Sequence, residues 1–177
     1  VKIAKDAASG KNIAVAGSVS TYGYFLKDGI ENMLPSFNEH LKILSNSGVD
    51  LIILEAMSSQ SEIVEALLKC SKNINLPIWL SISCVFDKNR EIYLGYDDDV
   101  KNDKPQIYEN FKESLYKFKK IHTGPILVAH SNMSVTDEAI KILKDNYNQI
   151  IGAYPNRGYF EKPEWKFIDN FQPKDYL

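Results

Sequence analysis

The stretch GPILVAHSNMS, residues 124–134, contains four consecutive apolar residues, 126–129, followed directly by His130, Ser131 and Asn132. A short continuous apolar run is typical of a strand that is covered on both faces. The polar cluster falls where that strand ends. In sheets of parallel strands, ligands bind beyond the carboxyl ends of the strands, so this segment predicts a buried strand and a candidate site together.

Four further apolar runs predict that this strand belongs to a five-stranded parallel sheet. Those runs are residues 13–19, 51–56, 78–84 and 150–154. Amphipathic segments between the runs predict helices over residues 35–47, with Pro35 in the first turn, and over 61–71, 106–121 and 136–147. Strands and helices alternate, which predicts α/β architecture with right-handed crossovers.

Periodicity alone leaves two folds open for such a chain. The five strands form either a doubly wound, flavodoxin-like sheet or a contiguous arc of an eight-stranded (β/α)8 TIM barrel. In both folds the chemistry lies in the loops after the strand ends. The chain has 177 residues, which predicts one domain, 1–177.

Composition narrows the class of partner. The net charge is −2, with 44% hydrophobic and 25% charged residues, so no electrostatic case exists for nucleic acid or a membrane surface. No membrane span or signal peptide is recognisable, which predicts a cytoplasmic protein. The opening residues VKIAKDAASGKN lack an initiator Met and resemble the end of a helix that stops at Gly10. We therefore expect a fragment of a longer protein.

The strand ends differ in their chemistry. Gly17 and Ser18 end the first run, where a ligand can approach the backbone closely, although a plain turn explains them equally well. Glu55 follows four aliphatic residues, and a carboxylate there needs a partner, either an internal one or a ligand. Cys84 is most simply a small buried hydrophobe, as is Cys70 on a helix. His130 is either a structural hydrogen-bonding residue or a ligand.

Two polar segments have plain interpretations. The three aspartates at 97–99 lie in a long polar stretch and predict a solvated turn, because the ligand spacing of a calcium loop is missing. After the fifth run, the sequence of residues 154–158 predicts a turn. The aromatic residues that follow predict a loop that either roofs a small-molecule pocket or caps the end of a barrel. They are Tyr159, Phe160, Trp165 and Phe167.

Four of these segments, taken in order, resemble the homocysteine S-methyltransferase family. VAGSVSTYG resembles the family's vaGSvgpyG segment, and GVDLIILEAMSS resembles GaDllllETip. PIWLSIS resembles pvwiSfs, and the YPN of IIGAYPNRGYFEKPEW resembles the vYPNsGe segment. The four segments are residues 15–23, 48–59, 77–83 and 150–165.

The resemblance implies a (β/α)8 barrel of roughly 250 to 300 residues, of which this chain covers strands three to seven. It also implies transfer of a methyl group to the thiol of homocysteine, with a sulfonium such as S-methylmethionine as donor. The product would be methionine. In the family a zinc ion held by three cysteines binds the thiol, and metal ligation lowers the thiol pKa. The partners implied are therefore a small-molecule thiol and a methyl donor, and a homo-oligomer stays open.

The sequence departs from the family at the position of one zinc ligand. A cysteine is expected near His130 and Ser131, and none is present. A neutral imidazole can ligate zinc, so His130 becomes the candidate metal ligand, and Cys84 is a distant alternative. An equally open interpretation is that His130 contacts substrate without metal.

The resemblance assigns Glu55 to the amino group of homocysteine. The candidate substrate-binding residues are Glu55, Gly17, Ser18 and Asn156. The competing hypothesis is a non-catalytic barrel that binds an amino acid or regulates, having lost the zinc site.

Overall fold

A computed structural model describes residues 1–21, 23–99, 104–161 and 163–167 of the chain. The helices are α1 (Lys2–Ala8), the short 3-10 helix η1 (Leu26–Asp28), α2 (Ile30–Asn46), α3 (Ser61–Ser71), α4 (Phe111–Phe118) and α5 (Met133–Asn146). The strands of the largest sheet are β1 (Ala16–Ser20), β2 (Leu51–Met57), β3 (Ile78–Ile82), β7 (Ile126–Ala129) and β8 (Ile151–Tyr154). The remaining strands are β4 (Cys84–Phe86), β5 (Ile92–Asp99), β6 (Lys104–Asn110), β9 (Gly158–Glu161) and β10 (Glu164–Phe167).

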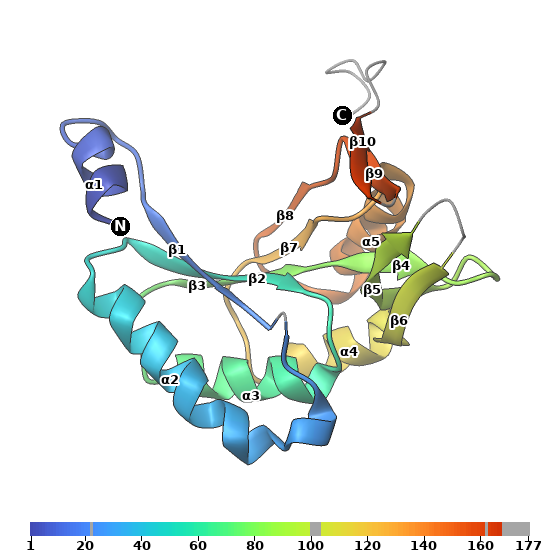
Figure 1. The fold of residues 1–177 in the computed structure, drawn as a ribbon, viewed down its shortest axis with the longest axis horizontal. Coiled ribbons are helices and arrows are strands. Elements are labelled where there is room, and N and C mark those ends of the chain that lie inside the picture. The colour runs from blue at the N-terminus through green and yellow to red at the C-terminus, as the bar shows by residue number, and fades with distance from the viewer. Residues whose placement is uncertain (22, 100–103, 162, 168–177) are drawn as a thin grey trace.

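The largest sheet contains all five predicted strands, in the order β1-β2-β3-β7-β8, and every pair in it is parallel. The spatial order therefore follows the order of these strands along the chain, and Figure 1 shows them as a curved arc. A doubly wound sheet reverses its strand order at a switch point. No reversal occurs among these five strands, so the flavodoxin-like alternative is wrong and the α/β class is confirmed.

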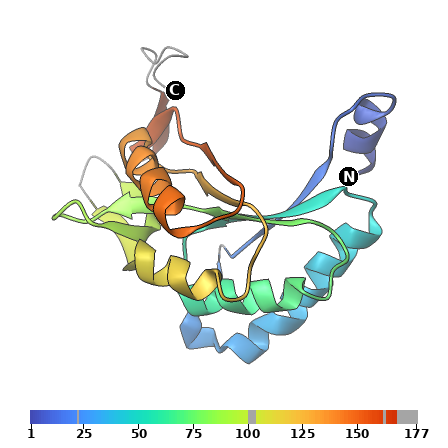
Figure 2. The same ribbon diagram turned by 180° about the vertical axis from the view of Figure 1, so that it is seen from behind.

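One face of this sheet is covered by helices. Helices α2, α3, α4 and α5 lie along the outer side of the arc in both views (Figures 1 and 2). The strand residues on that side, such as Leu54 and Leu80, are fully buried. A Cβ added at Gly17 would meet the Leu44 side chain of α2 at 3.2 Å, which places Gly17 on the helix side.

The helix boundaries follow local capping chemistry. The Asn110 side chain accepts a hydrogen bond from the Lys112 backbone at 3.0 Å, so α4 begins at Phe111. The predicted helix over 106–121 is therefore wrong at its start, and residues 106–110 belong to β6. Pro35 lies inside α2 instead of in its first turn, because the helix begins at Ile30, directly after Gly29.

Two segments predicted as loops are antiparallel strands. Asp97 pairs with Pro105 and Asp99 with Lys104, so the three aspartates extend β5 beside β6. Strands β9 and β10, residues 158–161 and 164–167, pair antiparallel. The sequence patterns mislead here because the aspartates follow a short alternation, Ile92 and Leu94, that is buried, and because β10 is exposed along its whole length.

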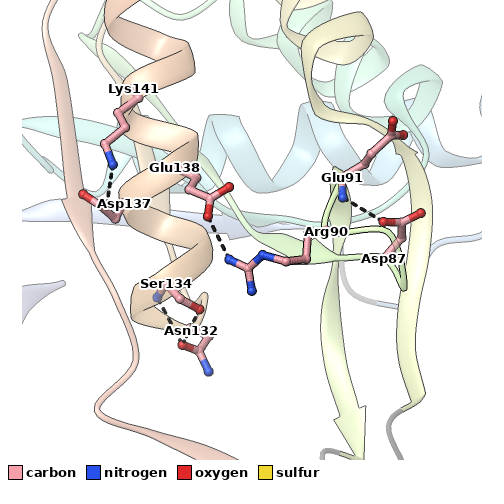
Figure 3. Close-up of polar contacts among 8 residues, drawn as sticks. All are labelled: Asp87, Arg90, Glu91, Asn132, Ser134, Asp137, Glu138 and Lys141. Atoms are coloured by element: carbon pink, nitrogen blue, oxygen red, sulfur yellow. Dashed lines mark hydrogen bonds and ion pairs between the residues drawn. The ribbon is translucent and has the colours of Figure 1, made fainter.

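Strands β4, β5 and β6 form a second sheet inserted between β3 and α4. Figure 3 shows how its β4–β5 turn contacts α5: the Arg90 guanidinium donates to Glu138 Oε1 at 2.8 Å. Asp87 holds the turn itself, accepting from the Glu91 backbone at 2.8 Å. The Arg90 side chain is 66% exposed, so this ion pair contributes about 0–1 kcal/mol.

Helix α1 confirms that the first residues are helical, and Gly10 follows with a positive φ of 72°. The Lys5 ammonium donates to Asp50 Oδ1 at 2.9 Å, and the Val15 backbone donates to Asp50 Oδ2 at 2.7 Å. Asp50 thus joins this helix to the beginnings of β1 and β2. Among the helices that the structure describes, none is long and apolar enough to cross a membrane.

Candidate functional site

Four polar side chains meet at the carboxyl ends of neighbouring strands. Glu55 Oε1 accepts a hydrogen bond from His130 Nε2 at 2.6 Å and another from the Tyr154 hydroxyl at 2.5 Å. The Ser81 hydroxyl lies 3.5 Å from the same oxygen and 2.5 Å from the Tyr154 hydroxyl. The four residues come from β2, β3, β8 and the residue directly after β7. We call them the Glu55 cluster.

The sheet register explains this convergence. Side chains alternate between the two faces of a strand, and Leu54, adjacent to Glu55, is buried on the helix side. Glu55 therefore points to the opposite, inner face. Leu80 pairs with Leu54, so Ser81 shares that inner face. Strand β8 supplies Tyr154 at its last residue, where it pairs with Ala129 of β7.

The cluster lies beside two residues in the left-handed region of the Ramachandran plot. Ala56, directly after Glu55, has φ 52°, and His130 has φ 50°. Residues with a Cβ adopt this conformation at a cost of about 1–2 kcal/mol. Such costs concentrate at functional sites, where the surrounding structure holds the backbone in place. Two of them next to one carboxylate distinguish this strand end from the others.

Three consecutive residues after β7 have three different partners. His130 turns to Glu55, as described above. The buried Ser131 hydroxyl donates to the Ala129 carbonyl and accepts from the Cys84 backbone, both at 2.8 Å, which joins the end of β7 to the start of β4. The Asn132 side chain accepts from the Ser134 backbone at 3.2 Å and caps α5. Of the three side chains, that of His130 is the one that reaches Glu55.

The Tyr154 hydroxyl remains a donor across the physiological pH range. Burial raises the pKa of Tyr154 well above its ordinary value, and its hydrogen bond to the Glu55 carboxylate raises it further. A phenol has one hydrogen, which Tyr154 gives to Glu55. Ser81 therefore donates to the phenol oxygen, and the hydrogen bonds run from Ser81 through Tyr154 to Glu55.

His130→Gly should be more stable than His130→Ala, by about 1 kcal/mol. Both variants lose the contact with Glu55, but glycine adopts a positive φ without the steric cost that alanine keeps. Urea unfolding of the two variants measures the difference. Equal midpoints, or a more stable alanine variant, would contradict the view that the backbone at His130 is strained.

The other predicted substrate-binding residues occupy different positions. Gly17 faces α2, as described above, and Ser18 lies on the inner face, where its strand neighbour is Ile53. Ser18 is two residues before the level of Glu55, about 7 Å along the strand. The Asn156 backbone donates to the Ser131 carbonyl at 2.9 Å, so this residue stands directly beside the cluster.

Sequence reasoning missed Tyr154 and Ser81 as members of the site. The sequence pattern predicts only that residue 154 begins a turn, and it gives no role to Ser81. The available signal is their position in the chain. Each lies near the end of a predicted strand, at a residue whose side chain points to the inner face of the sheet. Without the strand order, nothing in the sequence brings residues 81 and 154 to residue 55.

The donor set within the described residues does not complete a zinc site. Among them, no group of three or more His, Cys, Asp and Glu side chains could hold a metal ion. Cys84 is 1% exposed, and burial raises the pKa of its thiol far above the ordinary range. A catalytic zinc site takes three protein ligands. His130 and Glu55 supply at most two.

Comparisons with known proteins agree with the segments compared above. A family profile described as homocysteine S-methyltransferase matches residues 1–176. One matching solved structure is the apo form of the homocysteine methyltransferase MmuM from Escherichia coli, at 16% identity and a TM-score of 0.45. That match covers 89% of this chain and 63% of the MmuM chain. No curated protein sequence matched.

The fold and site define an α/β protein whose parallel strands present a hydrogen-bonded carboxylate at their carboxyl ends. Because the profile matches nearly the whole chain, the protein belongs to the homocysteine S-methyltransferase family.

Proposed function

We propose that this chain is part of a (β/α)8 barrel enzyme, strands three to seven, that transfers a methyl group from a sulfonium donor to homocysteine. The chain-ordered parallel sheet with helices on its outer side supports the barrel. Family membership supports the reaction. The observation that carries the proposal is the Glu55 carboxylate, which is held at the strand ends through one oxygen by residues of two other strand ends.

The two oxygens of Glu55 are in different situations. Oε1 accepts from His130 and Tyr154, whereas no hydrogen bond from the residues that the structure describes reaches Oε2. The Glu55 side chain is 22% exposed, so a ligand can reach part of it. An ammonium group has three N–H donors and forms strong charge-assisted bonds to a carboxylate. Oε2 therefore suits the α-ammonium group of homocysteine.

The reaction consists of a single displacement at carbon. The sulfur of homocysteine, as a thiolate, attacks the methyl carbon of the sulfonium. The bond from that carbon to the donor sulfur breaks, and its electron pair stays on the donor, which becomes a neutral thioether. Methionine is the product. The contribution of Glu55 is to orient the amino acid, because holding the two reactants in line replaces a bimolecular encounter with a positioned one.

Incubation of the full-length protein with homocysteine and S-methylmethionine tests the activity directly. We expect methionine to form, and its absence under zinc-replete conditions would count against methyl transfer. A second candidate function is a binding or regulatory barrel. It is favoured by the incomplete donor set for zinc among the described residues. Tight binding of homocysteine by calorimetry without methionine formation would establish that alternative.

Zinc ligation by His130 stays a prediction, and no step above depends on it. If His130 is a ligand, His130→Ala should lower the zinc content of the full-length protein. Ser131→Ala should not, since its hydroxyl is engaged with Ala129 and Cys84. Metal analysis of the purified proteins measures this. Equal zinc in the wild type and in His130→Ala would contradict ligation.

The remaining assignments are also proposals. Asn156, beside the cluster, and Ser18, on the inner face, would contact substrate with their side chains. Gly17 has no side chain and would contribute only through its backbone. A Cβ added there would point toward Leu44 of α2. The partners would be a small-molecule thiol and a methyl donor. A cytoplasmic location and a homo-oligomer stay predictions.

A further inference from the structure

Ser81 and Tyr154 form a support behind Glu55 that no substrate needs to touch. Ser81 is fully buried in the middle of the sheet, while Tyr154 is 37% exposed at its end. The Ser81 hydroxyl donates to Tyr154, whose phenol in turn donates to Glu55 Oε1. A buried hydroxyl without a partner is costly, so Ser81 fixes the orientation of the phenol. The phenol then fixes one oxygen of the carboxylate.

His130 constrains the same oxygen from a second direction. Its ring meets that of Tyr154 edge to face, with centroids 5.5 Å apart and planes 81° apart. Two donors, from the ends of β7 and β8, therefore converge on Oε1. A carboxylate whose first oxygen is doubly held has little freedom to rotate. Its second oxygen is therefore held in one orientation.

We propose that Tyr154, oriented by Ser81, is a positioning residue that aims Glu55 Oε2 at the ligand and makes the site selective for thiols carrying an α-ammonium group. The proposal rests on the proposed function, because it takes homocysteine as the ligand. It adds the residues that determine this selectivity. Tyr154 acts through Glu55 and needs no contact with the reacting sulfur.

The test compares homocysteine with its des-amino analogue, which keeps the thiol and carboxylate and lacks the amino group. In Tyr154→Phe the ring stays and the hydroxyl is lost. We expect the dissociation constant of homocysteine to rise about tenfold, the effect of losing one hydrogen bond to a charged group. That of the analogue should stay unchanged. In methylation assays KM should rise for homocysteine while kcat changes less than KM.

Matched variants separate positioning from damage to the fold. Tyr116→Phe removes a phenol hydroxyl from α4, where the side chain is 56% exposed, and should leave both dissociation constants unchanged. Ser71→Ala removes a buried hydroxyl that donates to a carbonyl within α3. Ser71→Ala should leave both dissociation constants unchanged. Ser81→Ala should raise the dissociation constant of homocysteine and leave that of the analogue unchanged. In the Ser81→Ala/Tyr154→Phe double variant, the two losses should be less than additive, since both act through one hydrogen-bond chain.

The results distinguish the two proposals. If the wild type binds homocysteine and Tyr154→Phe keeps the same preference over the analogue, the positioning role is wrong and the proposed function stands. If Tyr154→Phe weakens both ligands equally, the tyrosine is merely structural, and the positioning role is again wrong. If the wild type neither binds homocysteine nor forms methionine, the proposed function fails and the selectivity proposal falls with it.

Discussion

Glu55→Gln should weaken homocysteine binding by about thirtyfold or more, the loss expected when one partner of a charge pair is removed from a partly buried site. The substitution preserves the size of the side chain. Its carbonyl oxygen can still accept from His130 and Tyr154. The amide NH2 then stands where Oε2 was and presents donors to the donors of the ammonium group. Attraction is thus replaced by repulsion at the position that orients the substrate.

Isothermal calorimetry with homocysteine measures this effect. Glu138→Gln is the matched control, because Glu138 is also a carboxylate that accepts a hydrogen bond from a side chain, here on the exposed surface of α5. That variant should bind homocysteine as the wild type does. Unchanged binding in Glu55→Gln would remove the main support for the proposed function.

Leu41→Ala should lower the free energy of unfolding by about 2–5 kcal/mol, the range for truncating a buried leucine. Leu41 is fully buried in α2, on the helix side of the sheet. The cost combines lost burial with the cavity left behind it. Urea unfolding measures the loss as a lower midpoint at constant slope.

Ile43 provides the control on the same helix. Two residues from Leu41, it is 55% exposed, and Ile43→Ala should change stability by about 0.5 kcal/mol or less. Equal losses at both positions would show that α2 does not pack as described. Such a result would also undermine the assignment of β1 and β2 to one covered face, and with it the inward direction of Glu55.

The sequence predicts the framework well because buried parallel strands give a strong signal. The run 126–129 coincides with β7, and the helix predicted over 61–71 coincides with α3. Both are continuous or periodic apolar segments with many buried residues. The inserted sheet is hard to predict because its buried residues are few and dispersed: Ile92 and Leu94 are buried in β5, whereas the same strand ends in three aspartates.

Half of the Glu55 cluster could be predicted and half could not. Glu55 and His130 are unusual for their surroundings, a carboxylate and an imidazole directly after apolar strands. Tyr154 and Ser81 are ordinary residues for strands, and only the spatial order β2-β3-β7-β8 brings them to Glu55. The positive φ of His130 is also invisible in the sequence, since histidine does not indicate a left-handed backbone as glycine does.

The agreement between chain order and spatial order bears on how the site forms during synthesis. The chain is synthesised from its N-terminal side, and a domain generally folds as a unit. Glu55 and Ser81 are made first, and at that stage the carboxylate can remain hydrated. His130 follows, and Tyr154 is the last of the four residues to arrive. We therefore expect the desolvation of Glu55 to wait for β8, so that its partners are present when its water is removed.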